Sequence, residues 1–181
     1  MITKIRKELD EQEKIRSEAI KAGREIIPLC ARAIRSVQKG DYKPAEKAVS
    51  EIEGKIKKIE VILADYPVVK DATLGAIYQE YAELCIVLAY LEKKKLVEVN
   101  VPPEYYLLGL GDAIGELKRV GMELLAAGKK KEAKTLYEAL EDIYADYAGL
   151  TYPNSIVPGL KRKQDVARGV LNNFHDQLVR K

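Results

Sequence analysis

Acidic side chains stand inside two apolar stretches of this chain. Asp112 and Glu116 lie in the stretch from Pro102 to Arg119, which is otherwise apolar and rich in glycine. In a helix these two residues are about 40° apart, so both carboxylates project from one face about one turn apart. Glu80 and Glu83 lie in an earlier stretch and are separated by about 60° in a helix. Each stretch therefore predicts a helix with a pair of acids on one face.

Two further patterns indicate that these acids lie against other helices. After Glu83 the chain is apolar all round from Leu84 to Leu91, which is typical of a helix buried on every side. Glycines recur in the later stretch although each weakens a helix by about 1 kcal/mol relative to alanine, so we expect another backbone to pack very close. These glycines are Gly109, Gly111, Gly115 and Gly121. If the two helices pack antiparallel across the short turn at residues 100–103, the two acid pairs reach the same level.

The four residues Glu80, Glu83, Asp112 and Glu116 are called the acid cluster below. Carboxylates at short range raise one another's pKa unless a cation neutralises them. Ligand sets made only of oxygen favour Mg²⁺ or Mn²⁺ over zinc or copper. A di-iron site needs Glu-x-x-His motifs on two helices, whereas the only histidine here is His175. Metal-assisted hydrolysis of a phosphoester is the chemistry that the cluster supports best. The alternative interpretation is an ordinary solvated face, because acids at helical spacing are usually exposed.

The elements that must position these acids are amphipathic helices. With 181 residues, 47% of them hydrophobic, the chain is long enough for one sizeable core, and we expect a single domain over residues 1–181. Apolar residues at helical spacing, bounded by Gly, Pro, Asn and Asp, predict six to seven helices. Their expected ranges are 2–38 with a possible bend at Pro28, 41–64, 67–97, 102–128, 129–147 and 158–178. Short connections favour an antiparallel all-α bundle, and no segment shows sustained period-two alternation, so no sheet is expected.

Composition and charge limit the location and the partners. The net charge of +3 permits a polyanionic partner without requiring one. Cys30 and Cys85 both fall inside apolar helical patterns, which favours reduced thiols over a disulfide framework. The longest apolar run is too short to cross a bilayer, and the first residues do not resemble a signal peptide. We therefore expect a soluble cytoplasmic protein with no membrane association.

Four sequence blocks resemble the translin and translin-associated factor X family. They are GREI in the first helix, QEYAE in the third, PPEYYLLGLGDAIGELKR in the fourth, and LKRKQDVARGVL opening the last. The third block is by far the most distinctive. The four blocks span nearly the whole chain, and the order of the helices agrees with the all-helical translin fold.

The resemblance implies a more specific function than the bundle alone. Translin subunits bind single-stranded nucleic acid and lack the acid cluster, whereas translin-associated factor X subunits carry it and cut RNA with Mg²⁺. This chain is similar to the second kind, because Glu80 and Glu83 match the Glu-x-x-Glu pair of the third helix and Asp112 and Glu116 match the acids of the fourth. The expected activity is endoribonuclease cleavage of single-stranded RNA with low sequence specificity, with all four acids as ligands of Mg²⁺ or Mn²⁺. The family forms hollow octamers, so we expect a homo-octamer or association with a relative. The alternative is a non-catalytic scaffold that binds single-stranded RNA or DNA.

One departure from the family concerns RNA binding. Translin has a stretch rich in His and Arg just before the third helix, but here that region offers only Lys70. We therefore expect RNA contacts from other basic residues. The candidates are Arg24, Arg32, Arg35, Arg119, Lys161 and Lys163. For each of them, the alternative interpretation is an ordinary surface ion pair.

Overall fold

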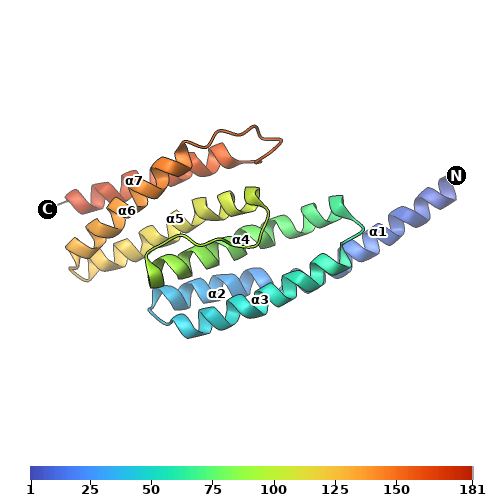
Figure 1. Cartoon of the computed structure of the whole chain (residues 1–181), viewed down its shortest axis with the longest axis horizontal. Coiled ribbons are helices and arrows are strands. Elements are labelled where there is room, and N and C mark those ends of the chain that lie inside the picture. Colours follow the sequence, from blue (N-terminus) through green and yellow to red (C-terminus); the bar gives the residue numbers. More distant parts are fainter. Residues whose placement is uncertain (181) are drawn as a thin grey trace.

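The computed structural model describes residues 1–180, which form seven α-helices and no strand. The helices are α1 (Ile2–Gly23), α2 (Ile26–Gln38), α3 (Tyr42–Ile62), α4 (Pro67–Lys93), α5 (Pro103–Ala126), α6 (Lys130–Ala148) and α7 (Leu160–Val179) (Figure 1). The prediction of an all-α bundle is confirmed. None of these helices has the length and hydropathy needed to cross a membrane.

The first predicted helix is in fact two helices, which meet at Arg24 and Glu25. The sequence predicts a bend at Pro28, but Pro28 lies in the first turn of α2. Proline has no amide hydrogen, and its ring clashes with the carbonyl four residues earlier, which here is that of Arg24. Because α1 ends before this point, Pro28 occupies a turn whose amides have no partner within the helix.

α4 and α5 run in the same direction, so the prediction that they pack antiparallel is wrong. Near the start of both helices, Tyr105 donates a hydrogen bond to Asp71 at 2.6 Å. Further along both, Gln79 donates to Asp112 at 2.6 Å. The contacts thus advance together along the two helices. Figure 1 shows the connection between them returning along α4 before α5 begins.

The connection at residues 94–102 can make this return only because it is not helical. α5 begins beside the first turns of α4, so the chain must travel back over about twenty helical residues, or about 30 Å. The nine residues 94–102 reach about 30 Å when extended. Lys94 turns the chain out of α4 in the left-handed backbone conformation, with φ of 56°. The end of α4 predicted near Val97 is therefore wrong by about one turn.

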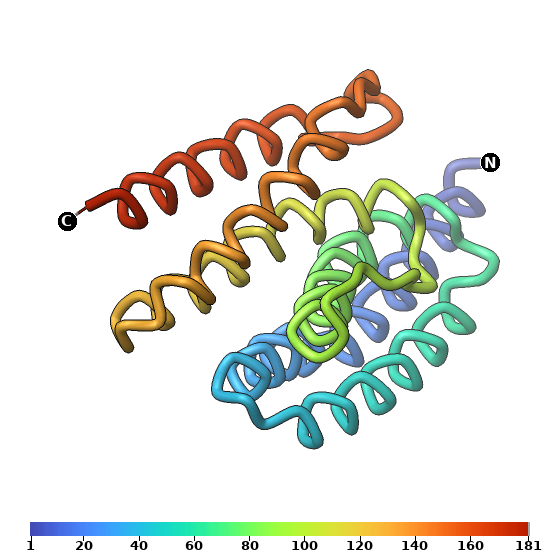
Figure 2. Tube along the Cα trace, turned by 60° about the vertical axis from the view of Figure 1, so that its left-hand side comes forward, coloured from blue at the N-terminus to red at the C-terminus, as the bar shows by residue number. Residues whose placement is uncertain are grey.

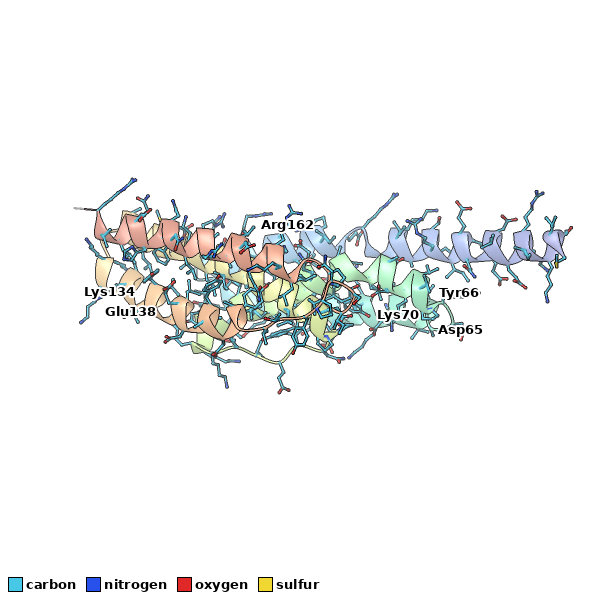
Figure 3. The ribbon with its side chains drawn as sticks, turned by 90° about the horizontal axis from the view of Figure 1, so that it is seen from above. Asp65, Tyr66, Lys70, Lys134, Glu138 and Arg162 are labelled. Atoms are coloured by element: carbon cyan, nitrogen blue, oxygen red, sulfur yellow. The ribbon has the colours of Figure 1, made fainter. Side chains whose placement is uncertain are left out.

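The seven helices form two groups that meet at the α4–α5 contact. α2 and α3 pack on α4, whereas α6 and α7 pack on α5 (Figures 1 and 2). Buried apolar side chains from all seven helices join in one cluster. The segment from Leu84 to Leu91 lies mostly in this core, as predicted. Figure 3 shows the N-terminal part of α1 projecting beyond the other helices, and residues 1–14 are exposed.

Candidate metal and nucleic-acid site

Gly109 sets the distance between the two helices that carry the acids. A Cβ atom at this position would stand 2.7 Å from the carbonyl oxygen of Gln79 and 2.9 Å from the amide nitrogen of Glu83. The backbones of α4 and α5 therefore touch beside the acid cluster, as the sequence predicts for this glycine.

The other three glycines of α5 do not lie against a backbone, which corrects the prediction. Gly111 packs on the side chains of Tyr147 and Lys163, and Gly121 packs on the ring of Phe174. A Cβ atom on Gly115 would have no neighbour within 4 Å. Close helix approach therefore requires Gly109 in particular.

The parallel packing brings the acid cluster together. Glu80, Glu83 and Glu116 line one cavity of about 140 Å³. The cavity walls are completed by Ala31, Ile34, Arg35 and Arg119. Asp112 lies close enough for its charge to act on both Glu80 and Glu83. The residues that sequence spacing put at one level are thus neighbours, although through a different topology from the predicted one.

Two members of the cluster have strong polar partners. One oxygen of Asp112 accepts a hydrogen bond from Gln79 at 2.6 Å, and the other forms an ion pair with Lys163 of α7. Glu116 accepts a hydrogen bond from Gln38 of α2, which in turn accepts one from Arg119.

The carboxylates of the other two members, Glu80 and Glu83, take part in none of the side-chain hydrogen bonds or ion pairs found within residues 1–180. The side chain of Glu83 is only 8% exposed. Burial, followed by the charges of Glu80, Asp112 and Glu116, raises the pKa of Glu83 to about 8. Burial and the charge of Asp112 also raise the pKa of Glu80. Burying a carboxylate without a positive partner costs free energy, so a cation in this cavity would stabilise the ionised acids.

The donor atoms fit a hard divalent cation in their chemistry, since all are carboxylate oxygens. They do not form a closed ligand set as they stand. Within residues 1–180, no three His, Cys, Asp or Glu side chains are grouped closely enough to hold a metal ion. Lys163 and Gln79 each hold one oxygen of Asp112. A cation bound by the whole cluster would lie beside the ammonium group of Lys163, and the two positive charges would repel.

Comparison with known proteins supports the resemblance seen in the sequence. The model of the Translin family matches residues 81–174, a range that includes Glu83 and both acids of α5. The chain belongs to the translin family. The uncharacterized protein MJ0175 of Methanocaldococcus jannaschii is 34% identical over 176 residues, which cover 94% of this chain and 78% of that protein.

Solved structures share this translin fold over nearly the whole chain. AfC3PO superposes with a TM-score of 0.88 at 27% identity, covering 98% of this chain and 95% of that one. AfC3PO in a complex with duplex RNA gives a TM-score of 0.86 at 26% identity, with 98% and 94% covered. NeC3PO without ligand gives 0.84 at 25% identity, with 98% and 95% covered. The translin fold predicted from the sequence blocks is confirmed.

The basic residues predicted to contact RNA fall into two sets in this translin-family chain. Arg35 and Arg119 line the cavity of the acid cluster, and Lys163 is paired with Asp112. The second set lies on the surface outside the cavity and consists of Arg24, Arg32 and Lys161. Lys161 pairs with Asp165 one turn along α7, which is the ordinary surface ion pair weighed as its alternative.

Three polar contacts of the cluster were missed by reasoning from the sequence. Gln38 and Gln79 were not singled out, and Lys163 was considered only for RNA. Gln38 is 78 residues from Glu116 in the chain, so no local spacing could connect them. Gln79 offered one weak signal, since it directly precedes Glu80 on the helix that carries the first acid pair.

Proposed function

We propose that this translin-family protein is a divalent-cation-dependent endoribonuclease of the translin-associated factor X type that cuts single-stranded RNA. The observation that carries the proposal is the location of Glu83, a buried carboxylate with no cationic partner of its own, surrounded by three other acids. Structural relatives include AfC3PO in a complex with duplex RNA, which supports an RNA ligand.

The residues of the cluster have separate roles in this proposal. Glu80, Glu83, Asp112 and Glu116 would hold Mg²⁺ or Mn²⁺. When bound, such a cation supplies a water of lowered pKa and polarises a phosphate oxygen. Arg35 and Arg119, at the wall of the same cavity, would bind a backbone phosphate and orient it toward the acids. Contacts of this kind read phosphates rather than bases, so sequence selectivity should be low.

The test is cleavage of labelled single-stranded RNA, with duplex RNA in parallel. We expect cleavage with Mg²⁺ or Mn²⁺, none with EDTA, and a loss of about 100-fold or more in the Glu80→Gln and Asp112→Asn proteins, because each removes a charged ligand. Glu123→Gln is the matched control, since Glu123 is an exposed acid on α5. Full activity in both cluster variants would exclude the proposed site.

A non-catalytic scaffold is the second candidate, and the engaged state of Asp112 favours it. With Lys163 and Gln79 on its two oxygens, Asp112 serves a structural contact between helices. A scaffold would retain RNA in the presence of EDTA, with affinity that falls steeply with salt, and would not cleave it. The same RNA incubations therefore distinguish the two functions.

We also propose that the protein assembles as a homo-octamer. Apolar side chains on the projecting part of α1, including Ile2, Ile5 and Leu9, are exposed in the single chain and offer surface for subunit contacts. Light scattering of the purified protein should give a mass of eight chains of 20.3 kDa each. A monomer at micromolar concentration would contradict this.

A further inference from the structure

Lys163 and Asp112 form an ion pair that joins α7 to α5 at the edge of the acid cluster. The two side chains are 28% and 27% exposed, so the pair is largely withdrawn from water. Gln79 holds the second oxygen of Asp112 at 2.6 Å. Both oxygens of this acid are thus committed to protein groups.

The packing of α7 on α5 fixes the position of Lys163. A Cβ atom on Gly111 would stand 3.1 Å from the Cβ of Lys163 and 2.8 Å from the hydroxyl oxygen of Tyr147. The lysine therefore starts directly beside the helix turn that carries Asp112. The Tyr147 hydroxyl is fully buried at the same glycine and has no hydrogen-bond partner within residues 1–180. A buried hydroxyl group without a hydrogen-bond partner thus lies beside the ion pair.

The charge of Lys163 reaches beyond Asp112. It lowers the pKa of both Glu80 and Glu83, which burial and the neighbouring acids raise. Lys163 therefore has the electrostatic role at the cluster that a bound cation would have. A metal ion bound at the same oxygen of Asp112 would lie beside the ammonium group, and because the two positive charges repel, the lysine and a metal ion compete for it.

We propose that Lys163 is a built-in counter-ion of the acid cluster, and that a divalent cation must displace it from Asp112 in order to bind. This inference rests on the proposed function and makes Lys163 a positioning residue that sets the cation affinity. Without metal, the lysine holds Asp112 and stabilises the assembled acids. Its departure opens one oxygen of Asp112 toward the cluster and leaves the ammonium group free.

The test is Mn²⁺ binding by the intact protein, followed by the electron paramagnetic resonance signal of free Mn²⁺. Lys163→Met removes the charge and keeps the length of the side chain, so the variant should bind Mn²⁺ about tenfold more tightly or better than wild type. In EDTA the same variant should unfold at a lower temperature than wild type, and Mn²⁺ should raise that temperature by more than it does for wild type.

Two further variants separate this role from a general charge effect. Lys163→Arg keeps a positive charge and should bind Mn²⁺ within about twofold of wild type. Lys134→Met removes a lysine from an exposed ion pair with Glu138 on α6 (Figure 3), a helix that carries no member of the acid cluster. This control should leave both Mn²⁺ affinity and its thermal effect unchanged.

Mn²⁺ binding by folded Lys163→Met protein that is equal to or weaker than that of wild type would overturn the inference. If circular dichroism shows that this variant does not fold, Lys163→Gln is measured instead by the same criterion. RNA cleavage is scored separately. A wild-type protein that cleaves RNA, combined with unchanged affinity in the variant, contradicts only the counter-ion role. Tighter Mn²⁺ binding by the variant of a protein that does not cleave supports the counter-ion role and contradicts the proposed nuclease.

Discussion

Protein in which Gly109 is replaced by alanine should be less stable than wild type by about 1 to 3 kcal/mol, because the added methyl group has no space. It would stand 2.7 Å from the carbonyl oxygen of Gln79 and 2.9 Å from the amide nitrogen of Glu83. Both are backbone atoms in the middle of α4, so they cannot rotate away as a side chain could. Urea unfolding followed by circular dichroism measures the loss. Because α4 and α5 must move apart where the acids meet, cleavage of RNA should also fall.

Gly115→Ala is the matched control on the same helix. A Cβ atom at Gly115 meets nothing within 4 Å, and alanine favours a helix by about 1 kcal/mol over glycine. This variant should therefore be as stable as wild type or more so. Equal stability of the Gly109→Ala and wild-type proteins would show that the two helices are farther apart than described.

Glu83→Gln should stabilise the protein at neutral pH while abolishing metal-dependent cleavage. The pKa of Glu83 is raised from its ordinary value of 4.5 to about 8 by burial and by the neighbouring acids. In the unfolded chain this carboxyl is ionised once the pH exceeds 4.5, whereas in the folded protein it stays protonated until the pH nears 8. Wild type therefore loses stability as pH rises from 4.5 toward 8, by up to about 3 kcal/mol at pH 7. Glutamine does not ionise and avoids this loss.

The measurement is urea unfolding in EDTA at several pH values, for wild type and Glu83→Gln. The stability difference should be small below pH 4.5 and should grow through the neutral range. Glu123→Gln, which changes an exposed acid of the neighbouring helix, should show no such trend. A Glu83→Gln protein less stable than wild type at pH 7 would mean that the carboxylate is ionised and held by a cationic partner.

The level at which the acids meet could be predicted from the sequence, but the direction of the helices could not. The two acid pairs are about 30 residues apart, so they align if the helices are antiparallel across a turn and also if they are parallel after a long return. Residues 94–102 decide between these, and they did carry a signal. Val97, Val99 and Val101 alternate with other residues, as in an extended segment. The alternation is short, and the position of α5 is needed to see that this extended segment spans most of the length of α4.

The partners of the acids lay beyond prediction for a different reason. Gln38, Gln79 and Lys163 come from three helices, and their contacts depend on how α2 and α7 pack around the α4–α5 pair. Helical spacing determines which residues share a face of one helix, but not which faces of two distant helices meet. The break before α2 is a similar case. Pro28 predicts an interruption of the helix, but the chain breaks at Arg24 and Glu25 instead.

The long return between α4 and α5 has a consequence for a newly synthesised chain. A ribosome that has made the protein through α4 has produced Glu80 and Glu83 alone, and the other two acids follow only after the chain has doubled back along the helix. Lys163 comes later still, on the last helix. In the nuclease proposed above, a chain that ends before Glu116 lacks at least one of the four acids that would hold the cation, so no complete acid cluster exists near the message until α5 has been made.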